Sequence, residues 1–485
     1  MMRKLNGTNV KKGLQYLKRN GLGETFYKAR ERLSKDGWDD GYQERFLSGR
    51  PGTEMLAGQR QEKYMHPYKI SILVPAHETD PAYLKEMIQS VIAQSYENWE
   101  LCIADGSESD QVGDTVTGLK ETIDPKVAAK IRYQKLSGNG GIAENTNAAL
   151  DMAGGEYVGL LDHDDLLEPD ALYEIMQVLS KNLSREGKIY VNRIRAIYTD
   201  EDKIDAEGSR YFEPNIKPDF DIDLLRSNNY ICHFFVVRTE LARSAGGFLE
   251  EFDGAQDHDF MFRCLENIPV SAVAHIPKVL YHWRCHNEST AINPESKRYA
   301  YEAGKRAVEA HLKRKGINAT VEHTAHLGFF RVIYVPVPAS VLRLTRKQWD
   351  EMGPEDYAAI REDYIMILAE DLKPLTQEYM KELTGVLSRY EVGCVGGKVY
   401  NKRFRIESAG YTKDENGKYI PNFSGLNGHY SGYMHRACLQ QRVDGVSLDC
   451  MLLRRSALEI GEDHKPKLAS NYIVVYDPYA EFKRK

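Results

Sequence analysis

The sequence feature that most constrains this chain is a short apolar run that ends at three carboxylates. Residues 158–161 read VGLL, and Asp162, Asp164 and Asp165 follow at once. An uninterrupted apolar run followed by a helical pattern predicts a buried parallel strand, and ligands bind at the carboxyl ends of such strands. Because crowded carboxylates repel one another, the cluster predicts a cation, and a divalent metal holding a diphosphate suits carboxylate oxygens. A solvated acidic turn is the alternative.

The composition is that of an ordinary globular protein of two or three domains. The chain has 485 residues, 42% of them hydrophobic and 28% charged. Its formal net charge of −6 argues against nucleic-acid binding. The N-terminus lacks the apolar core of a signal peptide, and nothing approaches the ~20 apolar residues that span a bilayer. Seven cysteines without a CxxC motif indicate reduced thiols, so we expect a cytoplasmic protein.

The N-terminal segment is strongly basic. Residues 1–33 hold nine Lys or Arg residues against Glu24 and Glu31, and Val10, Leu14 and Leu17 share one helical face. We expect a basic amphipathic helix that either lies on the inner face of an anionic membrane or docks on the catalytic domain, with equal weight. Residues 34–66 are rich in glycine and predict a loop and linker.

Strand and helix patterns alternate from about residue 68. Strands are predicted at 69–75, 100–105, 131–136 and 158–162, with helices at 83–94 and 142–152 between them. This alternation predicts a parallel sheet with right-handed crossovers. Three of the strands end in polar residues, namely at His77 and Glu78, at Asp105, and at the acid cluster. Their convergence on one sheet edge predicts a ligand site.

A glycine-rich turn imitates a dinucleotide-binding fingerprint. Residues 138–143 read GNGGIA, and Asp162 lies 19 residues beyond the last of them. However, the turn follows a third strand instead of opening the fold, and a ribose hydroxyl needs one acid rather than a cluster. We therefore interpret it as a tight turn that caps a helix and places Asn145 near the ligand.

Seven short motifs, taken in order, resemble those of the family 2 glycosyltransferases of GT-A fold. They are VPAHE at 74–78, QSY at 94–96, ADGS at 104–107, NTN at 145–147, LDHDD at 161–165, GAQDHD at 254–259 and LYHWRCH at 280–286. The resemblance covers about residues 68–292, and the order and spacing of the motifs are highly specific. It implies an α/β, Rossmann-like and mostly parallel sheet, and an inverting enzyme that moves a sugar from a nucleotide diphosphate to a hydroxyl.

The resemblance also implies roles for the donor-side residues. Asp105 would accept hydrogen bonds from the nucleobase, and Asn145 would lie near the ligand. The turn that holds Pro75, His77 and Glu78 would border the nucleotide. Asp162 would contact the ribose as well as the metal.

The catalytic and metal roles are implied in the same way. Asp162 and Asp164 resemble the family's DxD pair, which holds Mg²⁺ or Mn²⁺. Asp257 resembles the catalytic base, which takes the acceptor's proton while its oxygen attacks the anomeric carbon. His282 is predicted as a third metal ligand, with His286 as the fallback.

Two positions depart from the family pattern, and two acid motifs leave alternatives open. Ala104 and Gln256 stand where the family often has acids. Asp259 is a second candidate for the base, although the motif alignment favours Asp257. The acid run TDED at 199–202 resembles runs of this family, which leaves an acceptor-side or structural role open, but a solvated loop is favoured because polar residues continue after it.

The chain after residue 325 contains an echo of the acid-cluster motif. Residues 362–371, EDYIMILAED, match residues 155–164, GEYVGLLDHD, with Ala369 at the place of the first acid. Taking Val332 as the opening strand leaves too little chain for nucleobase-binding strands, and no counterpart of Asp257 is evident. We predict a basic helical segment and linker at 1–66, a catalytic domain at 67–325, and a truncated GT-A-like domain at 326–485 that neither binds donor nor catalyses.

The predicted function is sugar transfer from a UDP- or dTDP-linked donor to a glycan or lipid-linked acceptor, in bacterial surface polysaccharide synthesis. That setting is implied by the resemblance alone. The main alternative is a non-catalytic carbohydrate-binding or scaffold protein with a decayed site. A nucleotidyltransferase is disfavoured, because residues 74–80 contain no basic loop to hold phosphates.

Overall fold

The computed structural model describes residues 16–18, 21–23, 25–31, 41–186, 189–285, 298–461 and 465–485. It divides into two compact units. The larger unit contains Gly37–Phe220 and Asn229–His311, and the smaller unit contains Met1–Asp36, Asp221–Asn228 and Leu312–Lys485. The predicted domain boundaries at residues 66 and 325 stay a prediction, because the two compact units divide the chain at other positions.

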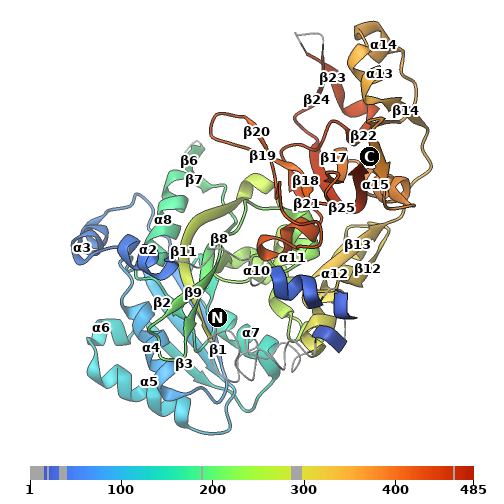
Figure 1. The fold of residues 1–485 in the computed structure, drawn as a ribbon. Helices are drawn as coiled ribbons and strands as arrows, with labels where there is room; N and C mark the ends of the chain where they lie inside the picture. The colour runs from blue at the N-terminus through green and yellow to red at the C-terminus, as the bar shows by residue number, and fades with distance from the viewer. Residues whose placement is uncertain are drawn as a thin grey trace. The chain divides into compact units, whose positions relative to one another are not determined.

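The larger unit is built on a mixed, nine-stranded sheet (Figure 1). Its strands, in spatial order, are β3 (Ile131–Lys135), β2 (Trp99–Asp105), β1 (Ile70–Ala76), β4 (Tyr157–Leu160), β10 (Phe235–Arg238), β8 (Ala196–Asp205), β11 (Val273–Cys285) and β5 (Leu166–Leu167), with β9 (Tyr211–Asn215) paired to β8. The first four strands are parallel to one another, and β10 runs against β4. The carboxyl ends of β1, β2 and β4 therefore meet at one edge.

The predicted strands and helices of this half are confirmed. β1 is buried along its whole length apart from Pro75, and its one polar side chain, Ser71, donates a 2.6 Å hydrogen bond to Glu100. Asp80 caps the next helix by accepting a hydrogen bond from Ala82 N, and Pro81 occupies its first turn. The helices of the unit are α2 (Tyr42–Gly49), α3 (Thr53–Gln61), α4 (Pro81–Ile92), α5 (Gln111–Thr122), α6 (Pro125–Ala128), α7 (Gly141–Met152), α8 (Ala171–Lys181), α10 (Thr239–Ser244), α11 (Gln256–Leu265) and the start of α12 (Arg298–Arg314).

The segment predicted as a loop and linker at 34–66 instead forms the helices α2 and α3. The ring of Tyr42 is buried, and its hydroxyl donates a 2.7 Å hydrogen bond to Asp202. Just beyond α2, Arg50 forms an ion pair with the buried Glu168. The linker prediction was wrong because it weighed glycine content alone, whereas Gly41 and Gly52 lie at the N-caps of these helices.

The smaller unit has a second mixed sheet. Its strands, in spatial order, are β14 (Val341–Thr345), β15 (Tyr364–Leu368), β22 (Cys450–Arg454), β17 (Val392–Tyr400), β25 (Ile473–Arg484) and β16 (Leu372–Pro374), with β18 (Ile406–Ser408) on β17 and β21 (Gln441–Val443) on β25. Short hairpins and helices complete it: β12 (Ala319–His323) with β13 (Phe330–Tyr334), β19 (Tyr411–Lys413) with β20 (Tyr419–Pro421), β23 (Leu458–Ile460) with β24 (Pro466–Leu468), α9 (Ile222–Ser227), α13 (Arg346–Glu351), α14 (Pro354–Ala359) and α15 (Tyr379–Leu387).

The two sheets have the same strand order. The path β1-β4-β10-β8-β11-β5 corresponds to β14-β15-β22-β17-β25-β16, and every neighbouring pair runs in the same relative direction. The register agrees as well, since Tyr157 pairs with Arg238 as Tyr364 pairs with Arg454. In both pairs the guanidinium lies over the tyrosine ring, at 5.8 and 5.6 Å from its centroid.

The smaller unit is therefore an incomplete copy of the larger sheet, as predicted. Among its described residues, no strand pairs with the outer edge of β14, so β2 and β3 have no counterparts there. The opening strand was misplaced, however. Val332 belongs to β13, which pairs only with β12, whereas β14 occupies the place of β1.

The described part of the N-terminal basic segment packs within the smaller unit. Residues 25–31 are helical, and the buried Glu31 accepts hydrogen bonds from Ser431 N and Gly432 N at 3.0 and 2.9 Å. Tyr27 stacks on His429 with 3.8 Å between ring centroids. The predicted docking of this helix on the catalytic domain was therefore wrong for residues 25–31, whose partners belong to the smaller unit. Contact with a membrane stays a prediction. Val10 and Leu14 lie outside the described residues.

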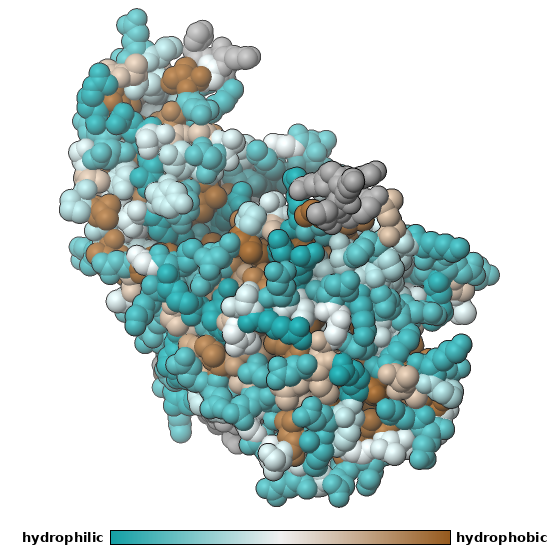
Figure 2. Space-filling view, turned by 180° about the vertical axis from the view of Figure 1, so that it is seen from behind, coloured by the Kyte–Doolittle hydropathy of each residue, from teal (hydrophilic) through white to brown (hydrophobic). Residues whose placement is uncertain are grey.

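Hydrophilic residues dominate the face seen in Figure 2, and hydrophobic residues are interspersed among them. Within the described parts of the chain, no helix combines the length and the apolar character that crossing a membrane requires.

Candidate functional site

The acid cluster at the end of β4 is held by buried contacts from β11. Asp165 is fully buried, and it accepts hydrogen bonds from the Tyr281 hydroxyl at 2.5 Å and from Arg284 N at 2.7 Å. Burial, together with the carboxylates of Asp164 and Asp162, raises the pKa of Asp165 well above its usual value. Asp165 therefore acts as an internal support, which leaves Asp162 and Asp164, both only partly buried, accessible to a ligand.

Arg284 ties the cluster to the rest of the sheet edge. Its side chain is completely buried. Nε donates to Asp164 O at 2.7 Å, Nη1 donates to Ala206 O at 3.0 Å, and Nη2 pairs with Glu86 at 2.6 Å. The donors of Arg284 therefore fix the backbone of the acid turn and of Ala206.

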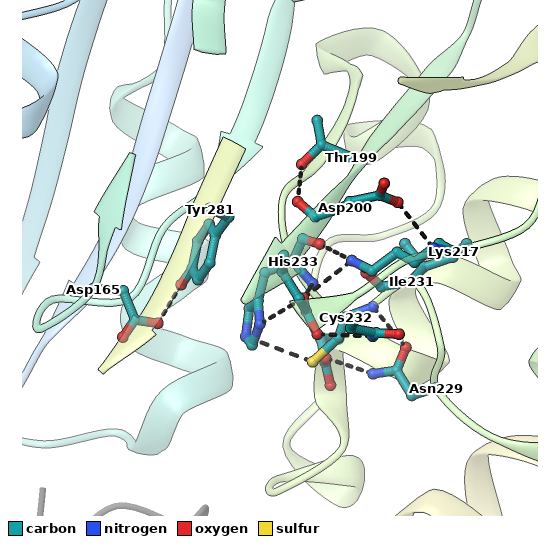
Figure 3. Close-up of polar contacts among 12 residues, drawn as sticks. Asp165, Thr199, Asp200, Lys217, Asn229, Ile231, Cys232, His233 and Tyr281 are labelled. Atoms are coloured by element: carbon teal, nitrogen blue, oxygen red, sulfur yellow. Dashed lines mark hydrogen bonds and ion pairs between the residues drawn. The ribbon is translucent and has the colours of Figure 1, made fainter. Parts of the chain in front are cut away.

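His233, which the sequence did not single out, is the histidine beside the acids. Its ring lies beside that of Tyr281 (Figure 3), with 4.5 Å between the two centroids. Its Nε2 lies 3.9 Å from Asp162. Ligand atoms of Asp162, Asp165 and His233 all lie within 4.8 Å of one another, a grouping able to hold a metal ion. An imidazole nitrogen with carboxylate oxygens is a donor set that Mn²⁺ accepts, and Mg²⁺ accepts the oxygens.

A buried ion pair fixes the position of His233. The ammonium of Lys217 contacts Glu201 at 3.0 Å and donates to Ile231 O and to His233 O. Glu201 also accepts from His233 N at 3.0 Å. Against the effect of burial, Lys217 and His233 lower the pKa of Glu201 to about 2, so this carboxylate is charged at neutral pH.

The acid run at 199–202 is therefore not a solvated loop. It forms the middle of β8, and all four side chains are buried. Glu201 contacts His233 and Lys217, while its neighbours Asp200 and Asp202 pair with His275 and His282. The interpretation was wrong because the run's partners come from distant segments, and the polar residues after it belong to the end of the same strand.

His282 lies away from the acid cluster. Successive side chains of a strand point to opposite faces, so Tyr281 reaches Asp165 while His282 points the other way. Its Nδ1 lies 2.5 Å from Asp202, and its Nε2 lies 3.0 Å from Glu168. Both nitrogens thus face carboxylates, which raise the pKa of His282 to about 9 despite burial. The predicted role of His282 as a metal ligand has no support in this geometry, and His286 lies outside the described residues.

The two candidate bases have different surroundings in α11. Asp257 lies in the first turn, is partly exposed, and accepts a 2.7 Å hydrogen bond from the Asn229 amide. Burial, and to a smaller extent the carboxylates of Asp164 and Asp257, raise the pKa of Asp162 above its usual value. Asp259 is completely buried and forms an ion pair with Arg263 at 2.7 Å. Only Asp257 is placed to receive a proton from an external hydroxyl.

The predicted nucleobase residue lies at the same sheet edge. Asp105 ends β2, which is two strands from β4, so the two strand ends are about 10 Å apart. Asp105 is buried and accepts from Ser107 N, the Tyr133 hydroxyl and Lys135 at 2.9, 2.7 and 3.2 Å. Against the effect of burial, these bonds lower its pKa.

The remaining donor-side residues form a compact set of turns. Glu78 accepts from Glu108 N and Ser109 N at 2.7 and 3.0 Å and so joins the turns after β1 and β2. Asn145 is buried, and its amide fills the space that Gly106 leaves, since a Cβ there would approach Asn145 Nδ2 to 2.6 Å. The side chains of Pro75 and His77 are partly buried and exposed, respectively. Their predicted contacts with a nucleotide stay predictions.

This edge therefore combines acids at the ends of parallel strands, a histidine beside them and a carboxylate on α11. Residues 71–244 match the model described as glycosyl transferase family 2. This part of the larger unit is thus similar to the family 2 glycosyltransferases, in agreement with the sequence motifs.

The chain is also similar to one uncharacterized protein and to two proteins whose names state a role in polysaccharide synthesis. The chain is 32% identical over 509 residues to the uncharacterized protein y4gI of Sinorhizobium fredii (88% of this chain, 54% of that protein). It is 30% identical over 402 residues to the O-antigen biosynthesis protein RfbC of Myxococcus xanthus (70% and 30%) and 31% identical over 224 residues to a chondroitin synthase of Escherichia coli (46% and 30%). The chain thus spans about half or less of the length of these relatives.

Solved structures with a similar fold include Staphylococcus aureus TarS 1–349 in complex with UDP-GlcNAc. That match has 17% identity and a TM-score of 0.38, and it covers 50% of this chain and 66% of that one. The mannosyltransferase PcManGT of Pyrobaculum calidifontis, in complex with GDP-Man and Mn²⁺, matches with 14% identity and a TM-score of 0.36, covering 54% and 69%.

Proposed function

We propose that the chain transfers a sugar from a nucleotide-diphosphate donor, of the UDP or dTDP type, to a hydroxyl of a glycan or lipid-linked acceptor, with inversion at the anomeric carbon. The observation that carries this proposal is that His233 lies 3.9 Å from Asp162, while Asn229, which bonds Asp257, also accepts from the backbone of Cys232 beside His233. Asp105, at the same sheet edge, is proposed to receive the nucleobase.

Asp257 is the proposed catalytic base. Its carboxylate takes the proton of the acceptor hydroxyl while that oxygen forms a bond to the anomeric carbon. The bond from this carbon to the diphosphate breaks, and the nucleoside diphosphate leaves with the electron pair. Because attack and departure occur on opposite faces, the configuration inverts in one step. The Asn229 amide orients the carboxylate through its 2.7 Å hydrogen bond.

The donor set beside β4 suits a divalent cation, Mg²⁺ or Mn²⁺. We propose Asp162, Asp164 and His233 as its ligands, with Asp165 supporting them from the interior. A cation bound there supplies charge neutralisation for the departing diphosphate. His233 replaces the predicted His282, both of whose nitrogens already face carboxylates.

We propose bacterial surface polysaccharide synthesis as the setting, at the cytoplasmic face of the cell membrane. Support comes from the printed names of two relatives, an O-antigen biosynthesis protein and a chondroitin synthase. The alternative of a non-catalytic scaffold is disfavoured, because the larger unit retains a partly exposed acid pair and a candidate base with an orienting partner.

The test measures transfer and hydrolysis with a panel of nucleotide sugars, with Mn²⁺, with Mg²⁺ and after chelation. Asp257→Asn should lower kcat by at least about 100-fold, which is the usual contribution of a general base, while donor affinity is retained. Asp164→Ala should weaken donor binding, and added Mn²⁺ or Mg²⁺ should no longer increase the rate of transfer. Asp151→Asn, which removes an exposed carboxylate from α7, is the matched control. Full transfer by both site variants would refute the proposal.

A further inference from the structure

The matching registers assign a smaller-unit residue to each residue of the acid site. Counting forward from the paired tyrosines, Tyr157 and Tyr364, places Ala369 where Asp162 stands and Asp371 where Asp164 stands. Counting back from the paired arginines, Arg238 and Arg454, places Asp449 where His233 stands. The hydrogen bond from Ala369 N to Asp449 O, 2.8 Å long, continues this pairing beyond the strand ends.

The interior support of the acid site is replaced by apolar residues in the smaller unit. In the larger sheet Glu201 pairs with Tyr281, and in the smaller sheet Val399 pairs with Phe482 at the same register position. Leu372 stands where Asp165 would be, next to Asp371. The connection from β22 to β25 also holds only a 3₁₀ turn and the β23–β24 hairpin in its described residues, instead of a helix like α11 that would carry a base.

Three carboxylates at this edge of the smaller unit contact one guanidinium. Arg484 pairs with Leu372 of β16 and stands at the register position of Trp283, which lies one residue beyond the last pair between β11 and β5. Its Nη1 contacts Asp371 at 2.8 Å, and its Nη2 contacts Glu407 at 2.6 Å and Asp449 at 2.5 Å. Asp371 and Asp449 are the counterparts of Asp164 and His233, so the guanidinium lies between the equivalents of two proposed metal ligands.

We propose that Arg484 is a built-in cation that takes the place of the metal in the smaller unit. A guanidinium pairs with carboxylates through hydrogen-bond donors in a fixed geometry. A metal ion, in contrast, keeps coordination positions that phosphate oxygens can occupy. The smaller unit therefore holds neither metal nor nucleotide diphosphate, and the chain has one donor site. The statement that Arg484 replaces a metal rests on the function proposed for the larger unit. The neutralisation of the three carboxylates by Arg484 rests on its ion pairs alone.

The experiment counts Mn²⁺ bound to the full chain by the electron paramagnetic resonance signal of the free ion. The background carries Asp162→Ala and Asp164→Ala, which remove the proposed site of the larger unit. In this background we expect no bound ion with Arg484 present, and one ion per chain after Arg484→Met, because Asp371 and Glu407 then lose their guanidinium partner while Asp449 keeps Arg346 at 3.3 Å. Arg484→Lys, which keeps the charge, should bind none, and Arg403→Met is the control for loss of an exposed arginine.

Adding Asp371→Asn and Asp449→Asn to Arg484→Met should abolish the new ion. Circular dichroism checks that each variant is folded, and Arg484→Gln replaces Arg484→Met if the latter is not. An unchanged count after removal of Arg484 in a folded variant would overturn the proposal. Bound Mn²⁺ is also counted for the chain without the background substitutions. If that chain binds no ion, the metal site proposed for the larger unit is contradicted, and the result for Arg484 can still be interpreted.

Discussion

The buried contacts of His282 predict a stability that depends on pH in a defined window. Each ring nitrogen lies within 3.0 Å of a carboxylate, so the native arrangement needs both nitrogens protonated. The pKa of His282 is about 9 in the folded chain, against about 6.5 for an unfolded histidine. At about 1.4 kcal/mol per unit, the difference of about 2.5 units corresponds to about 3 kcal/mol as an upper estimate.

The sign follows from the raised pKa. Below pH 6.5 the ring is protonated in both states, and the full contribution is present. As the pH rises from about 6.5 to 9, the unfolded state loses its proton first, so the free energy of unfolding falls until the folded ring also titrates. We therefore expect the larger unit of the wild type to lose up to about 3 kcal/mol between these pH values.

The assay is denaturant unfolding between pH 6 and 10, followed by tryptophan fluorescence. His282→Gln should be less stable than the wild type at pH 6, and the gap should narrow as the pH approaches 9. His77→Gln, which removes an exposed histidine of the same unit, should change neither the stability nor its pH profile. Parallel profiles for the wild type and His282→Gln would refute the assignment of His282 as a buried, doubly paired cation.

Two further substitutions distinguish residues that stabilise the fold from residues that take part in catalysis or donor binding. Asp259→Asn leaves the guanidinium of Arg263 without its buried partner, so it should cost about 3–5 kcal/mol of unfolding free energy, measured by denaturant titration; a folded, stable variant with a selective loss of kcat would instead make Asp259 the base. Tyr42→Phe removes the hydroxyl bonded to Asp202 and should lower stability by about 1–3 kcal/mol, while KM for the donor stays unchanged. A shifted KM would show that α2 contributes to donor binding.

The strand ends of the site were predictable because local patterns determine them. An apolar run fixes a strand, and the parallel connection between β1, β2 and β4 then brings their carboxyl ends together. Asp105 and Asp162 follow from this rule without any knowledge of side-chain contacts. The repeat followed in the same way, since the motif at 362–371 preserves the apolar run as well as its final acids.

The partners of those acids were not predictable in the same way. His233 lies two residues before the start of β10, and nothing in its sequence neighbours reveals that β10 lies between β4 and β8. Glu201 and Lys217 meet through the same arrangement, 16 residues apart in the chain. One signal was available for His282: it alternates with Tyr281 and Trp283 along a strand, so only one of the two sets can face the acid cluster.

Comparison of the two sheets indicates which buried charges the fold needs. The smaller sheet keeps the order, directions and register of the larger one with Ala369, Leu372, Val399 and Phe482 at the acid-site positions. The architecture therefore forms without Asp162, Asp165, Glu201 and the hydroxyl of Tyr281. Burying charged groups such as Glu201 and Lys217 carries a desolvation cost that an apolar replacement avoids. Because the larger unit bears this cost where its copy does not, the acid network is best explained by ligand chemistry at that edge rather than by stability.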